Sequence, residues 1–445
     1  MNTAIFKAYD VRGRVGSELT GEVCQMIGQA MGQWLPSQGA VAVGRDMRPD
    51  SAELASAVID GLRAQGRDVW DIGEVTSDMI YFTVGHFNLA GGAMITASHN
   101  PGDYNGIKFC REQAKPIGIE SGLAEVRDAA AAGHFEPAAQ PGSLQQKDVR
   151  KDWIQHALSF VKATDWPAYK VAVDAGNGMA GAIIPLLEEF VPLQITPMYF
   201  ELDGTFPNHI ANPLEPKNLV DLQARIRQDG LDFGIAFDGD GDRAVLVDET
   251  GEPLGGTIVT AILAKYFLQK HPHATILYNA ICGRVAKETI QANGGTPKRT
   301  KVGHSFIKAD MRTYDAVFAG EHSGHYYFKD NFSADSGLIG ALIAVQVLAD
   351  SGKKLSQLAA EFKTYVSIPE TNFEVADKDA KIHQLTATFT DGQQDMLDGL
   401  TVNYPNAWFN VRGSNTESLL RLNAEAKTQE ELEQLVTRVT EVIKA

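Results

Sequence analysis

Short apolar runs alternate with amphipathic stretches along this chain. The first set has an apolar run at residues 40–44, apolar positions at helical spacing over 52–62 and a second run at 68–72. Short apolar runs indicate buried strands, and apolar positions three or four residues apart indicate one face of a helix. The same order returns at residues 169–199 and 275–302. Three copies predict three α/β domains of similar build, each with a sheet and crossover helices.

The last part of the chain has a different pattern. Strand-like segments near residues 400–403, 408–411 and 418–422 precede an amphipathic helix over about 428–444. No fourth copy of the unit is found there, so we expect a smaller domain that mixes strands and helices. The expected fold class is therefore α/β, with three similar mixed α/β domains and a smaller C-terminal α+β domain.

Turn-rich stretches divide the chain. At 445 residues it is too long for one hydrophobic core. Residues 129–146 are rich in Ala, Pro, Gly and Gln and resemble a linker, while 249–253 and 366–371 have turn-like composition. The expected domains are residues 1–145, 146–252, 253–366 and 367–445.

Composition and charge exclude several classes of function. The net charge of -16 disfavours a nucleic-acid or anionic-membrane partner. Cys24, Cys110 and Cys282 lie far apart without a CxxC spacing, so we expect reduced thiols in a cytoplasmic protein. The N-terminus has no signal-peptide pattern. The longest apolar run, 338–349, is interrupted by Gln346 and is too short to span a bilayer, so we expect a core helix.

One serine lies in a context that favours chemistry. Residues 96–101, Thr-Ala-Ser-His-Asn-Pro, follow an apolar run at 93–95. Pro101 fixes its own φ and keeps Asn100 out of helical conformations, so Ser98 is on a short, stiff loop after a strand. Functional groups of α/β proteins gather at such loops. The Ser98 hydroxyl can be a nucleophile or a phosphate carrier, although a turn or helix cap is the ordinary role of a loop serine.

A second loop concentrates carboxylates. Asp238, Asp240 and Asp242 follow an apolar strand at 233–237, with glycines between them and Arg243 next. Glycine lets the backbone curl tightly enough for these side chains to share one space. Three adjacent negative charges are costly without a cation, and hard oxygen ligands favour Mg²⁺ or Ca²⁺.

Two alternatives compete for this loop. An EF-hand has a glutamate at its twelfth position, and Glu249 occupies that position here. However, Arg243 stands at the sixth position, where the EF-hand needs glycine, and the flanking segments are strands. A polar hairpin loop is the remaining alternative.

A third loop carries groups that can bind a sugar. Glu321 and Ser323 follow a predicted strand at 316–319, and they share a face if that strand continues. A carboxylate can accept hydrogen bonds from two adjacent sugar hydroxyls, with a serine in support. Three histidines, His304, His322 and His325, lie within residues 304–325, which favours a functional role for at least one of them.

Basic and polar residues elsewhere suit a phosphate. Tyr9, Asp10 and Arg12 lie close together near the start, where a charged surface strand is the alternative. Near the other end, Arg412-Gly413-Ser414-Asn415-Thr416 offers one guanidinium, two hydroxyls and an amide. Such a loop can surround a phosphate, but a turn between two strands explains it equally well.

Taken together, these segments resemble the phosphomannomutase/phosphoglucomutase group of the α-D-phosphohexomutase superfamily. The resemblance covers essentially the whole chain in the right order. The motifs that carry it are Ala8–Gly13, Gly44–Asp46, Thr96–Pro101, Asn105–Lys108, Asp238–Arg243, Gly303–His304, Gly320–His325 and Arg412–Thr416. It implies four domains around a central cleft, and a phosphoserine at Ser98.

The resemblance also implies roles for individual residues. Mg²⁺ would be held by Asp238, Asp240, Asp242 and an oxygen of phosphorylated Ser98. The expected catalytic residues are Ser98, Arg12, His99, Lys108, Arg243, His304 and His325. The expected substrate-binding residues are Tyr9, Lys301, Gly303, Glu321, Ser323, Arg412, Ser414, Asn415 and Thr416. The hydroxyl proton of the sugar is expected to pass to Lys108, His304 or His325.

The implied activity is the interconversion of mannose 6-phosphate and mannose 1-phosphate, with a hexose 1,6-bisphosphate as intermediate and activator. The Gly-Glu-His-Ser pattern at residues 320–323, with Tyr326 and Tyr327 after it, favours mannose. Glucose or dual specificity stays open, as does a glucosamine-phosphate substrate. The other classes are a Mg²⁺-dependent sugar phosphatase and a non-catalytic Ca²⁺-binding module. The expected partner is a hexose phosphate, and the expected assembly is a monomer or homodimer.

Overall fold

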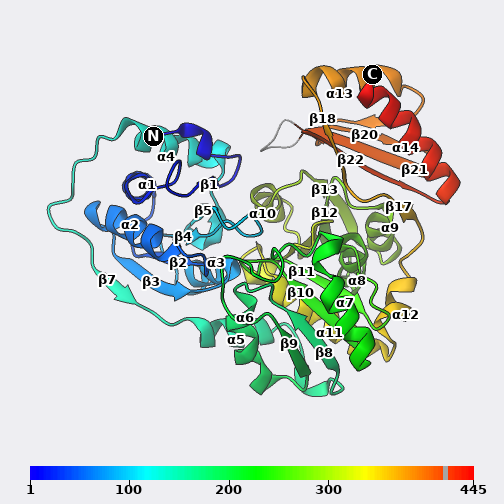
Figure 1. Ribbon diagram of the computed structural model, residues 1–445, viewed down its shortest axis with the longest axis horizontal. Coiled ribbons are helices and arrows are strands. Elements are labelled where there is room, and N and C mark those ends of the chain that lie inside the picture. The colour runs from blue at the N-terminus through cyan, green and yellow to red at the C-terminus, as the bar shows by residue number, and fades with distance from the viewer. Residues whose placement is uncertain (414–418) are drawn as a thin grey trace.

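The computed structural model describes residues 1–413 and 419–445. Within them the chain forms an N-terminal, a second, a third and a C-terminal sheet, each with its own helices. Figure 1 shows the N-terminal and C-terminal units on opposite sides at the top, with the second and third units below and between them. The expected α/β class, with its distinct C-terminal unit, is confirmed.

The N-terminal sheet is built around a parallel core. β2 (Val41–Arg45) lies between β3 (Val69–Glu74) and β4 (Gly91–Ile95), and both neighbours run parallel to it. β5 (Tyr104–Arg111) then pairs with β4 in the antiparallel direction, and β1 (Val11–Arg14) pairs with β5. The β4–β5 connection is therefore a loop at the carboxyl end of a parallel strand.

The second sheet repeats this arrangement. β8 (Lys170–Asp174) lies between the parallel strands β9 (Gln194–Met198) and β10 (Phe233–Phe237). β11 (Ala244–Asp248) pairs with β10 in the antiparallel direction. Glycine-containing β10 is buried along its whole length, which explains its nearly continuous apolar sequence.

The third sheet has the same order again. β12 (Thr275–Asn279) lies between the parallel strands β13 (Thr296–Thr300) and β14 (Phe318–Gly320), and β15 (Tyr326–Phe328) is antiparallel to β14. β16 (Ala334–Asp335) pairs with β15. The internal repeat expected from the sequence is thus present in the strand order of all three sheets.

Equivalent helices connect the strands of the repeat. The helix between the first and second strands of the parallel core is α2 (Ser51–Ala64) in the N-terminal unit, α6 (Ala180–Leu187) in the second and α9 (Arg284–Ala292) in the third. The helix between the second and third strands is α3 (Ser77–His86), α7 (Val220–Asp229) and α10 (His304–Thr313), in the same order of units. The other α-helices of the described residues are α1 (Gly21–Trp34), α4 (Leu123–Ala132), α5 (Arg150–Leu158), α8 (Gly256–Lys270), α11 (Gly337–Ser351), α12 (Leu355–Ala360), α13 (Lys378–Thr388) and α14 (Gln429–Lys444).

The linker expected at residues 129–146 is only partly a linker. α4 continues to Ala132, and β7 (Leu144–Gln146) adds a parallel strand beside β3. The composition of this stretch concealed the strand because its three residues are exposed and carry no apolar pattern on a buried face. A short strand β6 (Lys115–Pro116) also pairs with β5.

The C-terminal sheet is antiparallel. β20 (Leu400–Asn403), β21 (Ala407–Gly413) and β22 (Leu419–Ala426) are successive neighbours, as the alternating pattern predicted. Edge strands β17 (Val366–Ser367), β18 (Thr371–Glu374) and β19 (Gln393–Asp395) complete the sheet as described. The predicted amphipathic helix is α14, whose apolar face packs on β21 and β22.

The apolar run expected to be a core helix is α11. Its residues are buried on nearly every side, and it packs against α5, α8 and β11. No helix in residues 1–413 and 419–445 has both the length and the apolar character needed to cross a bilayer.

Candidate active site

Three loops with candidate functional residues occupy the same position in the three repeats. Ser98 lies between β4 and β5, the acidic loop 238–242 lies between β10 and β11, and Glu321 lies between β14 and β15. The carboxyl ends of parallel strands are where α/β folds place their sites. An isolated antiparallel β-bridge between Arg243 and His325 joins the second loop to the third. The sequence repeat therefore brings three distant motifs into one space.

The Ser98 hydroxyl points at the acidic loop. Its Oγ donates a hydrogen bond of 2.7 Å to Asp238 Oδ2 and lies 3.0 Å from His99 Nδ1. The Arg243 guanidinium is 3.4 Å from the same Oγ and also contacts His99 Nδ1. Burial and the nearby Arg243 charge keep the pKa of His99 well below its ordinary value, so the imidazole is neutral.

The acidic loop is a buried cluster of oxygens. The candidate ligand atoms of Asp238, Asp240 and Asp242 all lie within 4.8 Å of one another. Asp240 Oδ1 has no hydrogen-bond partner among the described residues, and Asp242 Oδ1 has only the His325 ring at 3.4 Å. Buried polar atoms are nearly always paired, so these oxygens suit a cation. The cluster is compatible with a metal site.

Two cations of the chain already compensate part of this charge. Lys108 Nζ lies 2.7 Å from Asp240 Oδ2 and 2.6 Å from Asp242 Oδ2, and Arg243 Nε lies 2.9 Å from Asp238 Oδ2. Burial alone lowers the pKa of Lys108, but the two carboxylates outweigh it and raise that pKa. The ammonium group therefore stays charged.

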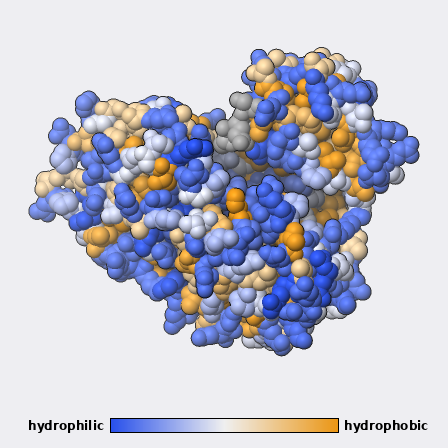
Figure 2. All heavy atoms as spheres, in the orientation of Figure 1, coloured by the Kyte–Doolittle hydropathy of each residue, from blue (hydrophilic) through white to orange (hydrophobic). Residues whose placement is uncertain are grey.

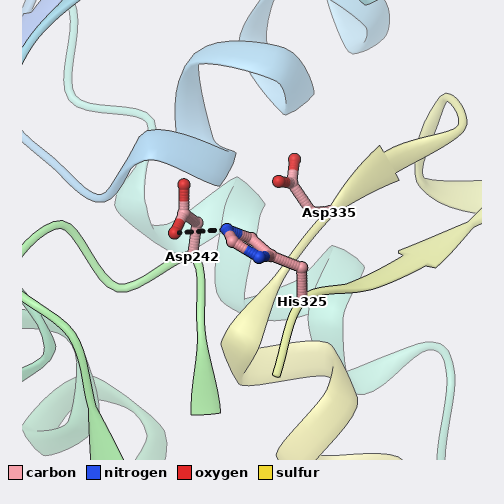
Figure 3. Close-up of side chains that lie close together, drawn as sticks. All are labelled: Asp242, His325 and Asp335. Atoms are coloured by element: carbon pink, nitrogen blue, oxygen red, sulfur yellow. Dashed lines mark ion pairs between the residues drawn. The ribbon is translucent and has the colours of Figure 1, made fainter. Parts of the chain in front are cut away.

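His325 lies beside the acidic loop (Figure 3). Its imidazole points at Asp242, and Asp335 of β16 lies next to both, with candidate ligand atoms of all three within 4.8 Å of one another. On the other side, His325 Nδ1 is 2.9 Å from Ser323 Oγ and 3.5 Å from Glu321 Oε1. Burial lowers the pKa of His325, but Asp242 outweighs it and the net shift is upward.

Glu321 is held by two residues that sequence reasoning missed. Asn279 Nδ2 donates a 2.9 Å hydrogen bond to Oε2, and the Tyr327 hydroxyl donates to Oε1. Asn279 ends β12, far from Glu321 in sequence, and Tyr327 lies in β15, where the sequence singled it out only as part of the pattern after Glu321 and not as a contact of that side chain. Both side chains are buried within the sheet. A pattern of apolar positions predicts such burial but does not show that these two residues bind Glu321.

The expectation that Glu321 and Ser323 share one face of a continuing strand is wrong. β14 ends at Gly320, and the chain turns so that Glu321 N donates to His325 O at 3.0 Å. Gly324 has a φ of 82°, a conformation that glycine adopts without strain. The glycine was the available signal for this turn.

The N-terminal residues face the third repeat. The rings of Tyr9 and His304 meet edge to face with centroids 4.8 Å apart. Arg12 Nε pairs with Asp10 at 2.8 Å, and its Nη1 lies 3.5 Å from Asn100 Oδ1. Both ring nitrogens of His304 are buried without a hydrogen-bond partner in the part of the chain described. Burial and then the charge of Lys308 keep the pKa of His304 well below its ordinary value.

The C-terminal unit contributes Arg412. This buried guanidinium lies 3.3 Å from Glu370 Oε2, and Arg421 lies 3.1 Å from Glu370 Oε1. Burial raises the pKa of Tyr9, with the charges of Asp10 and Glu321 adding to the rise and those of Arg12 and Arg412 opposing it. Sequence reasoning missed Glu370. Ser414, Asn415 and Thr416 lie outside the described residues.

The remaining predicted residues are near the start of α10. Gly303 precedes the helix with a φ of 135°, and Lys301 is exposed with its Nζ 5.6 Å from the centre of the Phe306 ring. The surface in Figure 2 is hollowed between the N-terminal unit on the left and the C-terminal unit at the upper right.

Family models match the chain in successive parts. They are described as phosphoglucomutase/phosphomannomutase alpha/beta/alpha domains I, II and III and the C-terminal domain, and they match residues 3–136, 151–251, 255–365 and 370–442. Together with the repeated fold and the clustered motifs, these matches establish that the chain belongs to the phosphoglucomutase/phosphomannomutase family.

Individual relatives cover nearly the whole chain. It is 39% identical over 441 residues to a protein from Salmonella montevideo named phosphomannomutase, covering 96% of this chain and 95% of that one. It is 36% identical to the phosphomannomutase/phosphoglucomutase of Pseudomonas aeruginosa, covering 99% and 96%. A crystal structure of a phosphoglucomutase/phosphomannomutase family protein from Burkholderia thailandensis superposes with a TM-score of 0.92 at 32% identity, covering 100% and 98%.

Proposed function

We propose that this protein is a cytoplasmic phosphomannomutase, active as a monomer or homodimer. It interconverts mannose 6-phosphate and mannose 1-phosphate through a phosphoserine at Ser98 and a hexose 1,6-bisphosphate. The observation that carries the proposal is the 2.7 Å hydrogen bond from Ser98 to Asp238, inside a buried acidic cluster. The relatives named phosphomannomutase support the choice of sugar.

The acidic cluster suits Mg²⁺. Asp238, Asp240 and Asp242 offer hard oxygen ligands, and the unpartnered Asp240 Oδ1 leaves a ligand atom available. An oxygen of phosphorylated Ser98 completes the proposed set. When bound, Mg²⁺ supplies positive charge next to the transferring phosphoryl group and the serine oxygen.

In the transfer step the bond between Ser98 Oγ and phosphorus breaks while a sugar hydroxyl oxygen bonds to phosphorus. The sugar hydroxyl loses its proton and Ser98 Oγ regains one, so no net proton is released. Arg243 and Lys108 are positioned to stabilise negative charge at this point, with Arg12 and neutral His99 beside the phosphoryl group. Stabilising charge in the transition state is the main task of a protein in phosphoryl transfer.

Lys108, His304 and His325 are the candidates for the group that accepts the proton. Lys108 is bound to two carboxylates, which favours a charge-stabilising role. His304 is uncharged with both nitrogens free of partners in the described residues, which suits a base. His325, beside Asp242, is the other candidate, and whichever group accepts the proton returns it when the same step runs in reverse.

Substrate binding divides between sugar and phosphate. Glu321, supported by Ser323, accepts hydrogen bonds from sugar hydroxyls. The phosphate that does not react is bound by Arg412, Ser414, Asn415 and Thr416. The remaining proposed substrate-binding residues are Tyr9, Lys301 and Gly303. Once the bisphosphate has turned, its other phosphate returns to Ser98.

A coupled assay tests this function. We expect mannose 1-phosphate to give mannose 6-phosphate in the presence of Mg²⁺ and a trace of glucose 1,6-bisphosphate, with little inorganic phosphate, because a closed site excludes water. Glucose 1-phosphate in a parallel reaction measures dual specificity. Inorganic phosphate released in proportion to substrate consumed would identify a phosphatase instead.

A further inference from the structure

A single buried arginine holds the loop that carries Ser98. The side chain of Arg48, in the loop between β2 and α2, has no exposed surface. Its two terminal nitrogens donate to four backbone carbonyls of the Ser98 loop. These are Ser98 at 2.9 Å, Asn100 at 2.6 Å, Pro101 at 2.7 Å and Tyr104 at 2.8 Å.

The loop needs this support because its backbone is strained. Ser98 has a φ of 49°, in the left-handed region that residues other than glycine seldom adopt. Such conformations persist only where the surroundings impose them, and they are concentrated at functional sites. Here four carbonyls converge on one planar guanidinium, which fixes their directions relative to each other.

Arg48 is itself anchored. Its Nε lies 3.3 Å from Asp46 Oδ2, while Asp46 Oδ1 accepts from Ser51 Oγ at 2.6 Å. Ser51 in turn accepts a 2.9 Å hydrogen bond from Asn105 at the start of β5. The guanidinium therefore has a defined position relative to both strands that flank the Ser98 loop.

The second unit packs against the side chain and backbone of Arg48. The Phe206 ring centre lies 5.2 Å from the Arg48 guanidinium carbon. A Cβ at Gly204 would lie 2.5 Å from Arg48 Cα, and one at Gly239 would lie 2.5 Å from Ser98 O. Only glycine fits at these contacts, so Arg48 and the Ser98 loop dock closely against the unit that carries the acidic cluster.

We propose that Arg48 is a positioning residue that fixes the Ser98 backbone so that Oγ stays directed at Asp238 and Arg243. The inference rests on the proposed role of Ser98 as phosphate carrier. Arg48 is placed to act through the loop, because its hydrogen-bond and ion-pair partners are four backbone carbonyls and Asp46, and its remaining contact is the Phe206 ring. Its loss should therefore lower kcat and leave KM for the hexose phosphate nearly unchanged.

The chain provides a matched control. Arg67 is also buried in the N-terminal unit and donates to the carbonyls of Gly32, Leu35 and Ser37 at 2.8, 2.7 and 2.6 Å. None of these partners belongs to the loops described above. Arg67→Lys and Arg67→Met should therefore lower stability as the Arg48 variants do, without affecting Ser98.

The experiment compares Arg48→Lys and Arg48→Met with the two Arg67 variants in the full-length enzyme. For Arg48→Lys we expect kcat to fall by about tenfold or more with KM within about twofold, since small misplacements of reacting groups cost this much. Amide hydrogen exchange over residues 96–105 should become faster in the Arg48 variants only. Asp46→Asn, which leaves Arg48 in place, should give a smaller loss of kcat and a smaller increase in exchange. This variant keeps the inference testable if Arg48→Met does not fold.

Four results decide between the possibilities. Parent-like kcat and exchange in Arg48→Lys overturn the inference, as does an equal loss of kcat in Arg67→Lys at equal stability. Failure of the parent enzyme to take phosphate from glucose 1,6-bisphosphate at Ser98 instead overturns the proposed function. Faster exchange and lower kcat confined to the Arg48 variants support the inference.

Discussion

Ser98 Oγ donates its hydrogen bond to Asp238 Oδ2 across 140 positions of sequence. The two residues occupy the same place in successive repeats, because each follows the third strand of a parallel core. Glu321 follows the corresponding strand of the third repeat. Docking three copies of one fold through their equivalent loops thus brings Ser98, the acidic cluster and Glu321 together.

Asp240→Asn should weaken Mg²⁺ binding and slow phosphoryl transfer. The change removes negative charge from a cluster in which Asp240 Oδ1 is the available oxygen. The measurement is the rise in melting temperature with added Mg²⁺, together with the Mg²⁺ dependence of kcat. Asp152→Asn, an exposed residue on α5, is the charge-matched control. Unchanged Mg²⁺ dependence in Asp240→Asn would show that the loop is not the metal site.

Glu321→Gln should impair the use of both monophosphates more than the phosphorylation of Ser98 by glucose 1,6-bisphosphate. The amide cannot accept from both Asn279 and Tyr327 at once, so it also disturbs the network that orients the side chain. Tyr327→Phe should give a smaller effect in the same direction. An equal loss in every assay would indicate that Glu321 only maintains the fold.

Arg412→Ala should raise KM for hexose phosphates by the loss of a charge-assisted contact, about 1.5–3 kcal/mol. We also expect the bisphosphate to escape before it has turned, so the variant should depend more on added glucose 1,6-bisphosphate. Arg438→Ala in the same unit removes a surface ion pair with Asp391 and is the control. If KM and bisphosphate dependence both matched the parent enzyme, Arg412 would not bind the idle phosphate.

Asp78→Asn should change how stability depends on pH. Asp78 accepts from Ser336 Oγ at 2.6 Å in a fully buried site, and burial raises its pKa to about 7. An unfolded Asp releases its proton near pH 3.9, so folding is increasingly penalised as the pH rises from there to about 7. Asp78→Asn removes this penalty. Urea unfolding at about pH 5 and pH 8 should show the variant gaining stability relative to the parent at the higher pH; parallel curves would contradict the assignment.

The sequence predicted the parts of the site that have a local signature. β10 and the acidic loop after it lie where the apolar run and the Asp-Gly alternation placed them. The fold class followed from the repeated strand and helix spacing, because that spacing is imposed by burial of one face of each element.

Residues that act through tertiary contacts had no such signature. Asp335 approaches Asp242 and His325 only because β16 pairs with β15. Glu370 meets Arg412 only through the pairing of strands in the C-terminal sheet. Arg48 was near a recognised motif, yet its partners are backbone carbonyls, which every residue has and which no sequence pattern distinguishes.

The most direct test of the phosphoserine mechanism is to follow the phosphate on Ser98 by mass spectrometry of its peptide. After incubation with glucose 1,6-bisphosphate and Mg²⁺, we predict one phosphoryl group on Ser98. Excess mannose 1-phosphate should then remove it and yield hexose 1,6-bisphosphate, and Ser98→Ala should neither take up phosphate nor turn over substrate. Formation of mannose 6-phosphate by the Ser98→Ala variant at the parent rate would contradict the central claim.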